Sequence, residues 1–224
     1  MSSSDSTPLV VTIDGPAASG KSSTAGLVAA RLGVRHVDSG MLYRSVTAAR
    51  LRDGGAPEHW TEQSVLDAAR RVSLAPASTG FTPLLDGVDC TEEIRGEAVT
   101  ALVSLVAKMS HVRAWVNAMV RATASSHAVV VDGRDMGTAV FPDARLKVWL
   151  VAMPAERARR RVLQRTGREP THGELEAETA ELEARDLKDR EQTQPAPDAV
   201  WIDTTGISQD EQVGRIAALA EERQ

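Results

Sequence analysis

The sequence predicts an α/β fold built on a doubly wound, mostly parallel, five-stranded sheet with helices on both faces. Short apolar runs that are typical of buried strands alternate with segments of helical periodicity along the chain. The first apolar run leads directly into a glycine-rich loop and then into a helix. Hydrophobic residues make up 42% of the 224 residues, which is enough for one sizeable core. The expected strands are residues 9–13, 34–37, 128–131, 146–151 and 200–202.

The loop after the first strand reads G-x-x-x-x-G-K-S, which is a phosphate-binding loop in its proper context. Gly15 and Gly20 allow backbone N–H groups to turn around a phosphate chain, and the helix that follows adds a partly positive N-terminus. Lys21 is expected to contact the β- and γ-phosphates of ATP, and Ser22 to ligate Mg²⁺. A glycine-rich turn without this role is the alternative, and the flanking strand and helix argue against it. The predicted ATP-binding residues are Gly15, Pro16, Ala17, Ala18, Ser19, Gly20, Lys21, Ser22 and Ser23.

Polar residues follow two further strands of the predicted sheet. Asp38 and Ser39 follow the second strand, and Asp132 to Asp135 follow the third. Ligands of such sheets bind at the carboxyl ends of the strands, so one site is expected to gather these groups beside the phosphate loop. Asp14 and Asp132 are both placed to organise a hydrated metal ion, and the sequence does not rank them. Read singly, these groups also fit helix caps and polar turns.

The strand and helix alternation fails in two places. Between residues 54 and 95, a helix at 61–71 and strands near 72–75 and 82–88 predict a hairpin-like insertion. Residues 155–191 are dense in arginine and glutamate, which predicts two solvated helices around a turn. The length favours a single domain over two.

Composition narrows the classes of partner. A net charge of −5 argues against general attraction to nucleic acid and favours a small anionic substrate. Cys90 is the only cysteine, so an intramolecular disulfide and a multi-cysteine zinc site are excluded, and a reducing cytoplasm is the expected compartment. Residues 1–8 read as a frayed tail without the features of a secretory signal, and no apolar stretch reaches membrane-spanning length. Without a coiled-coil seam, a monomer is expected.

Phosphoryl transfer depends on positioning and charge neutralisation, so a kinase should also carry arginines aimed at an acceptor phosphate. Arg44 and Arg134 follow two of the expected strand ends, and six further arginines lie between residues 157 and 168. Some of these six must simply face water.

The order of these motifs resembles the bacterial cytidylate kinases over nearly the whole chain. Apart from the phosphate loop, the resemblance is carried by residues 38–40 with Tyr43 and Arg44, by 93–95, by 132–138 with 141–144, and by 183–190. It implies transfer of the γ-phosphoryl group of ATP to CMP or dCMP. It further implies a core of residues 9–53, 96–153 and 195–224, a monophosphate-binding insertion at about 54–95, and an arginine-rich lid at about 154–191.

The resemblance also implies residue roles. Cytosine presents an amino donor at C4 and acceptors at N3 and O2, so its recognition needs a carboxylate and hydrogen-bond donors. Asp135 matches the carboxylate, and Arg113 and Ser104 match the donors. The acceptor phosphate would contact Tyr43, Arg44, Arg134 and Arg185, with Asp189 on the ribose and Ser39 and Asp132 also on the substrate side. The expected catalytic residues are Lys21, Arg134, Arg157 and Arg161.

The chain departs from the family pattern at the end of this segment. Gln192 stands where a further arginine is common, and Lys188 stands where an arginine is frequent, so a planar guanidinium is missing at both positions.

Three other functions remain open from the sequence. The nearest is another small-molecule kinase of this fold, acting on a different nucleotide, shikimate or a sugar acid. A GTPase switch would need an Asn-Lys-x-Asp guanine reader, and the only asparagine, Asn117, is followed by Ala118, Met119 and Val120. An RNA-binding ATPase would fit the arginine-rich stretch, but the interleaved glutamates and the net negative charge oppose it.

Overall fold

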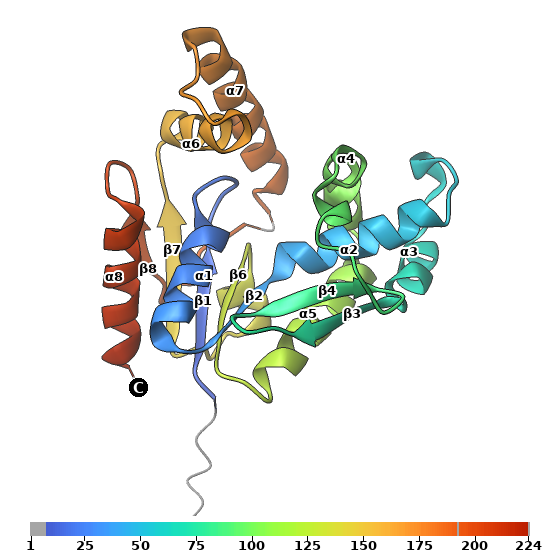
Figure 1. The fold of residues 1–224 in the computed structure, drawn as a ribbon, viewed down its shortest axis with the longest axis horizontal. Coiled ribbons are helices and arrows are strands. Elements are labelled where there is room, and N and C mark those ends of the chain that lie inside the picture. Colours follow the sequence, from blue (N-terminus) through green and yellow to red (C-terminus); the bar gives the residue numbers. More distant parts are fainter. Residues whose placement is uncertain (1–7, 192, 224) are drawn as a thin grey trace, which may run out of the picture.

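The computed structural model describes residues 8–191 and 193–223. Its centre is a five-stranded sheet in the order β2-β6-β1-β7-β8, in which every neighbouring pair of strands is parallel (Figure 1). The doubly wound α/β fold predicted from the sequence is therefore confirmed. The strands are β1 (Val10–Asp14), β2 (Arg35–Asp38), β6 (Val129–Gly133), β7 (Leu146–Val151) and β8 (Val200–Asp203).

Both faces of this sheet are buried, which explains why the strands read as continuous apolar runs. In β6, Val130 packs on one face, and Val129 and Val131 pack on the other. Helices α1 (Lys21–Leu32) and α8 (Gln209–Glu221) cover the first face. The second face carries a larger cluster that includes α2 (Ser39–Arg52), α4 (Glu97–Val106) and α5 (Ser110–Ala124).

The predicted insertion contains a small antiparallel sheet of its own. Its strands are β3 (Val72–Pro76), β4 (Phe81–Leu85) and β5 (Val88–Asp89). Helix α3 (Glu62–Ala69) precedes it and begins at a capping box in which Thr61 and Ser64 exchange hydrogen bonds. In Figure 1 this sheet lies with α2 to α5 to the right of the five-stranded sheet. Single helical turns at Pro57–His59, Glu93–Arg95 and Met136–Val140 complete the connections.

The arginine-rich segment forms two helices, α6 (Pro154–Thr166) and α7 (His172–Asp189). Gly167 ends α6 with a left-handed backbone (φ 72°), and Thr171 starts α7 with a capping box to Glu174. Both helices lie above the carboxyl ends of the strands (Figure 1). The prediction of two helices around a turn is confirmed.

The strand ends differ from the prediction in one useful respect. β6 continues through Asp132 and Gly133, and Asp14 and Asp38 are the last residues of β1 and β2. The carboxylates expected just beyond the strands are therefore held inside the parallel ladder, where Asp38 pairs in register with Asp132. Backbone pairing continues past the apolar residues, which an apolar pattern alone does not reveal.

Two expectations from the sequence concern residues that the structure does not describe. Residues 1–7 of the expected tail and Gln192 lie outside the described part of the chain. Within the described part, the structure has no helix with the length and apolar character needed to cross a bilayer.

Candidate active site

The phosphate loop connects β1 to α1, as predicted. A Cβ on Gly15 (φ 155°) would lie 2.2 Å from the carbonyl oxygen of Leu150, so this position accepts only glycine. Gly20 takes a left-handed backbone (φ 90°) as the N-cap of α1. The buried hydroxyl of Ser19 has no hydrogen-bond partner, which leaves a polar group free for an anion at the start of α1.

Lys21 lies across the loop and donates from Nζ to the carbonyl oxygen of Pro16 at 2.6 Å. Burial, together with the nearby Arg134 guanidinium, lowers the pKa of its ammonium to about 8. A phosphate chain would replace this repulsion with attraction, so the loop is electrostatically prepared for an anion.

The structure separates the two carboxylates that the sequence left unranked. Ser22 Oγ donates to Asp132 Oδ2 at 2.5 Å. Asp14 instead accepts hydrogen bonds from the backbone N–H groups of Met136 (3.0 Å) and Gly137 (2.8 Å). A hydroxyl and a carboxylate form the all-oxygen donor set that Mg²⁺ prefers, so Ser22 with Asp132 fits that ion and Asp14 serves the backbone.

A first cavity of about 310 Å³ opens from the phosphate loop towards α4 and α5. At its far end Arg113 forms an ion pair with Asp135 and donates to the carbonyl oxygen of Ala107 at 3.2 Å. The phenol of Tyr43 is buried there without a hydrogen-bond partner, and its ring lies 6.0 Å from the Arg113 guanidinium. Ser104 lines the same wall. The end of the cavity therefore offers a carboxylate, guanidinium donors and a ring.

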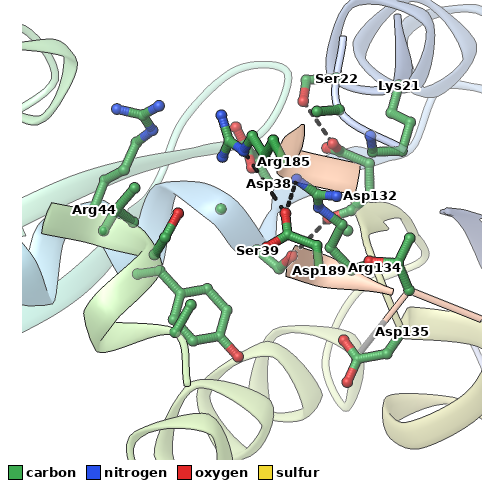
Figure 2. Close-up of a pocket in the computed structure, with 18 of the residues that line it drawn as sticks. Lys21, Ser22, Asp38, Ser39, Arg44, Asp132, Arg134, Asp135, Arg185 and Asp189 are labelled. Carbon is green, nitrogen blue, oxygen red and sulfur yellow. Dashed lines mark hydrogen bonds and ion pairs between the residues drawn. The ribbon is translucent and has the colours of Figure 1, made fainter. Parts of the chain in front are cut away.

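A second group of charges lies between this end and the loop (Figure 2). Arg134 forms an ion pair with Asp189 at 3.0 Å, and Arg185 approaches the same carboxylate at 3.7 Å. One guanidinium nitrogen of Arg134, Nη1, is buried without a partner. Ser39 is buried and donates from Oγ to the carbonyl oxygen of Asp132 at 2.8 Å, so its hydroxyl holds two strands together.

Arg44 reaches into the site from α2, apart from the Arg134 group (Figure 2). It donates to the carbonyl oxygen of Ile94 at 3.2 Å and to Thr100 Oγ1 at 3.0 Å. Burial and the neighbouring Arg185 lower its pKa. Arg44 has no carboxylate among these hydrogen-bond partners, so its guanidinium is available to a phosphate.

A second cavity of about 740 Å³ lies on the other side of the loop, bounded by the starts of α1 and α8 and by α6. Its wall includes Arg159, Arg160, Arg161 and Gln164. The two cavities meet at the phosphate loop and share six lining residues. These are Ala17, Ala18, Lys21, Ser22, Arg44 and Arg185.

The two arginines of α6 that were expected to be catalytic, Arg157 and Arg161, occupy different places. Arg161 lines the second cavity while it contacts the buried Glu178 at 3.1 Å. Arg157 lines neither cavity; it is 4% exposed, donates to the carbonyl oxygen of Ala17 at 2.9 Å and contacts Asp186 at 2.7 Å. The structure therefore brings Arg161 to the site and places Arg157 behind the loop.

Asp38, expected from the sequence among the polar groups at the strand ends but given no role, lines the first cavity, and burial and the charge of Asp132 raise its pKa to about 6. Asp186 lies within the segment 183–190 that carries the family resemblance, but no role was assigned to it. Thr100 and Gln164 were not chosen from the sequence, because each is an ordinary polar residue of a helix until packing places it.

A parallel sheet, a phosphate loop at the end of its central strand and two cavities that meet there define a nucleotide-dependent phosphotransferase of the P-loop class. A sequence profile described as cytidylate kinase matches residues 11–222. The cytidylate kinase of Geobacillus kaustophilus is 44% identical over 219 residues, covering 95% of this chain and 96% of the relative. That of Thermus thermophilus is 42% identical over 209 residues, covering 93% and 97%. The chain belongs to the cytidylate kinase family.

Solved structures support the fold alone. An uncharacterized protein from Eubacterium ventriosum superposes with a TM-score of 0.52 at 10% identity, covering 96% of this chain and 99% of that one.

Proposed function

We propose that this protein transfers the γ-phosphoryl group of ATP to CMP or dCMP, giving ADP and CDP or dCDP. The observation that carries the proposal is the Arg113–Asp135 pair at the end of a cavity that opens onto Lys21 of the phosphate loop. The carboxylate suits the C4 amino group of cytosine, and the guanidinium suits N3 and O2. Uracil would place a carbonyl oxygen against Asp135, which a carboxylate repels.

The remaining groups of the first cavity suit a nucleoside monophosphate. Tyr43, Arg44, Arg134 and Arg185 would hold the acceptor phosphate, and the unpartnered Nη1 of Arg134 is a donor in place for it. Asp189 would accept from the ribose, and Ser104 would contribute to the base end. Ser39 and Asp132 would support this side from behind.

ATP would bind along residues 15–23 with its nucleoside in the second cavity. Magnesium, when bound with the nucleotide, neutralises charge on the outer phosphates, and Ser22 with Asp132 would hold it. Lys21 would contact the transferring phosphoryl group, Arg161 would offset its spreading charge, and Arg157 would fix the loop. The acceptor phosphate oxygen attacks in line, the bond to the β-phosphate oxygen breaks, and no protein atom becomes covalently linked.

Motion of α6 and α7 over the two cavities would exclude water, which otherwise competes with CMP as acceptor. We propose residues 54–95 as the monophosphate-binding insertion and 154–191 as the lid of this reaction. We further propose that the enzyme works as a monomer in the cytoplasm, with no nucleic acid partner.

An acceptor screen tests the proposal directly. With Mg²⁺ and ATP, initial rates are measured for CMP, dCMP, UMP, AMP and dTMP, and for shikimate and gluconate as acceptors from other kinases. The expected result is kcat/KM for CMP or dCMP at least tenfold above that for every acceptor without a cytosine. A reaction without acceptor measures background ATP hydrolysis. Transfer to AMP or dTMP as fast as to CMP would contradict the proposal.

A further inference from the structure

His36 lies beside the phosphate loop and has no part in the roles assigned so far. Its Nε2 lies 2.6 Å from Asp132 Oδ1, and its side chain is 19% exposed while that of Asp132 is 3% exposed. The other carboxylate oxygen of Asp132, Oδ2, accepts from Ser22 at 2.5 Å. Asp132 therefore bridges His36 and the hydroxyl suited to magnesium, and each of its two oxygens has one of these partners.

The fold places these three residues on one face of the sheet. His36 pairs in register with Val130, and Asp132 lies two residues further along β6, so its side chain is on the same face as that of Val130. Helix α1 covers this face. Ser22 and Gly26 lie one turn apart on α1, and a Cβ on Gly26 would lie 3.6 Å from Nδ1 of His36. The ring is thus held beneath the first turns of α1.

The backbone of His36 is fixed as firmly as its ring. Its N–H donates to the carbonyl oxygen of Thr79 at 3.0 Å, at the tip of the β3–β4 hairpin. Gly80 lies so close that a Cβ there would be 2.8 Å from the His36 carbonyl oxygen. A ring that lies beneath α1 on a backbone fixed by the hairpin can impose its direction on the carboxylate, whereas a mobile surface histidine could not.

The contacts around the ring favour donation from Nε2 to the carboxylate, because a carboxylate oxygen is an acceptor and Oδ2 of the same group already accepts from Ser22. Asp38 pairs in register with Asp132, so two carboxylate residues meet at this strand end. A hydrogen bond donated by His36 to Asp132 offsets the repulsion between them.

We propose that His36 is a positioning residue that orients Asp132 towards Ser22, and thereby tunes how tightly the enzyme holds a nucleotide together with its magnesium ion. This proposal rests on the assignment of Ser22 to magnesium in the proposed function. His36 is not among the residues that line either cavity, so its effect on a bound nucleotide must pass through Asp132. Loss of its hydrogen bond frees the carboxylate to turn away from Ser22.

The test is calorimetric and needs no turnover. Dissociation constants of ADP are measured with and without Mg²⁺ for the wild type and for His36→Leu and His36→Gln. The dissociation constant without Mg²⁺ divided by the constant with Mg²⁺, called the metal ratio here, reports how much the metal strengthens ADP binding. Leucine removes the donor at similar size, whereas the glutamine amide keeps a donor at the reach of Nε2. We expect His36→Leu to lower the ratio by about tenfold and His36→Gln to restore most of it.

A second histidine provides the control. His172 contacts Glu176 at 3.3 Å on the exposed side of α7, so His172→Ala removes a histidine–carboxylate pair away from the loop. Its metal ratio should equal that of the wild type. If His36→Leu fails to fold, His36→Asn replaces it, because its amide ends one bond short of Asp132.

Three results would overturn the proposal. They are an unchanged ratio in His36→Leu, equal losses in His36→Leu and His36→Gln, and a loss of ADP affinity that is the same with and without Mg²⁺. The last would indicate a structural role only. Because ADP binding does not involve CMP, a failed acceptor screen with a lowered metal ratio would reject the proposed substrate and keep the role of His36.

Discussion

At the scale of single residues, Asp135 is the side chain for which the structure supports the most specific role. It is 8% exposed and its carboxylate is paired with Arg113. A carboxylate buried beside a guanidinium is positioned before any ligand arrives, so little ordering is required on binding. The identity of this side chain should therefore control which base is accepted.

Two substitutions at Asp135 test that claim. Asp135→Ala should lower kcat/KM for CMP by roughly a hundredfold, since a buried charged hydrogen bond contributes about 3 kcal/mol and Arg113 is left unpaired. Asp135→Asn should narrow the preference for CMP over UMP, because an amide can donate to O4 of uracil. Steady-state kinetics with both acceptors measure these changes.

The affinity for ADP separates the two halves of the site. It should stay within about twofold in both Asp135 variants, because Asp135 does not line the second cavity. Asp198→Asn, which alters an exposed carboxylate paired with Lys147 at 2.9 Å, is the matched control. A loss of ADP affinity as large as the loss in kcat/KM for CMP would show that Asp135 contributes to nucleotide binding in the second cavity, against our assignment.

Whether a site residue could be predicted from the sequence depended on what places it in the site, a strand end or the packing of a helix. Lys21 and Ser22 follow the loop after β1 and Asp132 lies near the end of β6, and the parallel sheet brings strand ends together, so their proximity could be predicted from the sequence alone. Ser104 and Arg113 lie on α4 and α5, where only tertiary packing decides which helix face meets the cavity. Their choice came from the family resemblance.

At the scale of elements, helices α6 and α7 are joined to the phosphate loop by a small group of hydrogen bonds and ion pairs. Asp186 on α7 accepts from the backbone N–H of Ala17 at 3.3 Å and contacts Arg157 of α6 at 2.7 Å. Arg157 in turn donates to the carbonyl oxygens of Ala17 and of Ala152. Both helices are thereby tied to one residue of the loop.

Removing the Arg157–Asp186 contact should weaken the attachment of α6 and α7 to the phosphate loop. Arg157→Ala leaves Asp186 without its cation, and we expect a loss of about 2–3 kcal/mol in the free energy of unfolding, with weaker ADP binding. Arg157→Lys should recover part of the lost stability, because lysine keeps the positive charge but cannot form the several hydrogen bonds of a planar guanidinium. Urea unfolding and calorimetry measure the two effects.

An exposed ion pair serves as the comparison. Arg215→Ala breaks the 2.7 Å contact with Glu211 on the surface of α8 and should cost less than about 0.5 kcal/mol. If Arg157→Ala cost equally little stability, the contact behind the loop would have no role in holding α6 and α7 in place.

Element types were predictable because periodicity reports which faces are buried. Element ends were less so. The helix expected at 61–71 ends at Ala69, and β6 runs on into Asp132 and Gly133, because hydrogen bonding rather than hydrophobicity decides where an element stops. The docking of Thr79 on His36 joins segments 43 positions apart, and no local pattern signals it.

At the scale of the whole molecule, stability is coupled to the site through Asp14. This carboxylate is 5% exposed at the end of the central strand. Burial raises its pKa to about 6 from 3.8, against the hydrogen bonds from Gly137 and Met136. A raised pKa in the folded state means that the neutral form is favoured there, so folding becomes less favourable as the group ionises.

The pH dependence of unfolding tests this coupling. The stabilisation from protonated Asp14 is present at low pH and is lost as the pH rises through 6. Between pH 5 and 7.5 the stability of the wild type relative to Asp14→Asn should fall by about 1 kcal/mol. Urea unfolding of both proteins across this range gives the difference at each pH. A difference that stays constant or grows would show that Asp14 is already ionised at pH 5.

The common wall of the two cavities has a practical consequence for inhibitor chemistry. Lys21, Ser22, Arg44 and Arg185 line both cavities, so an oligophosphate tether joining two nucleosides would pass three cationic side chains and a hydroxyl on its way from one cavity to the other. Once one end of such a bisubstrate compound is anchored, the other experiences a millimolar effective concentration, and the joined molecule gains avidity without any new contact.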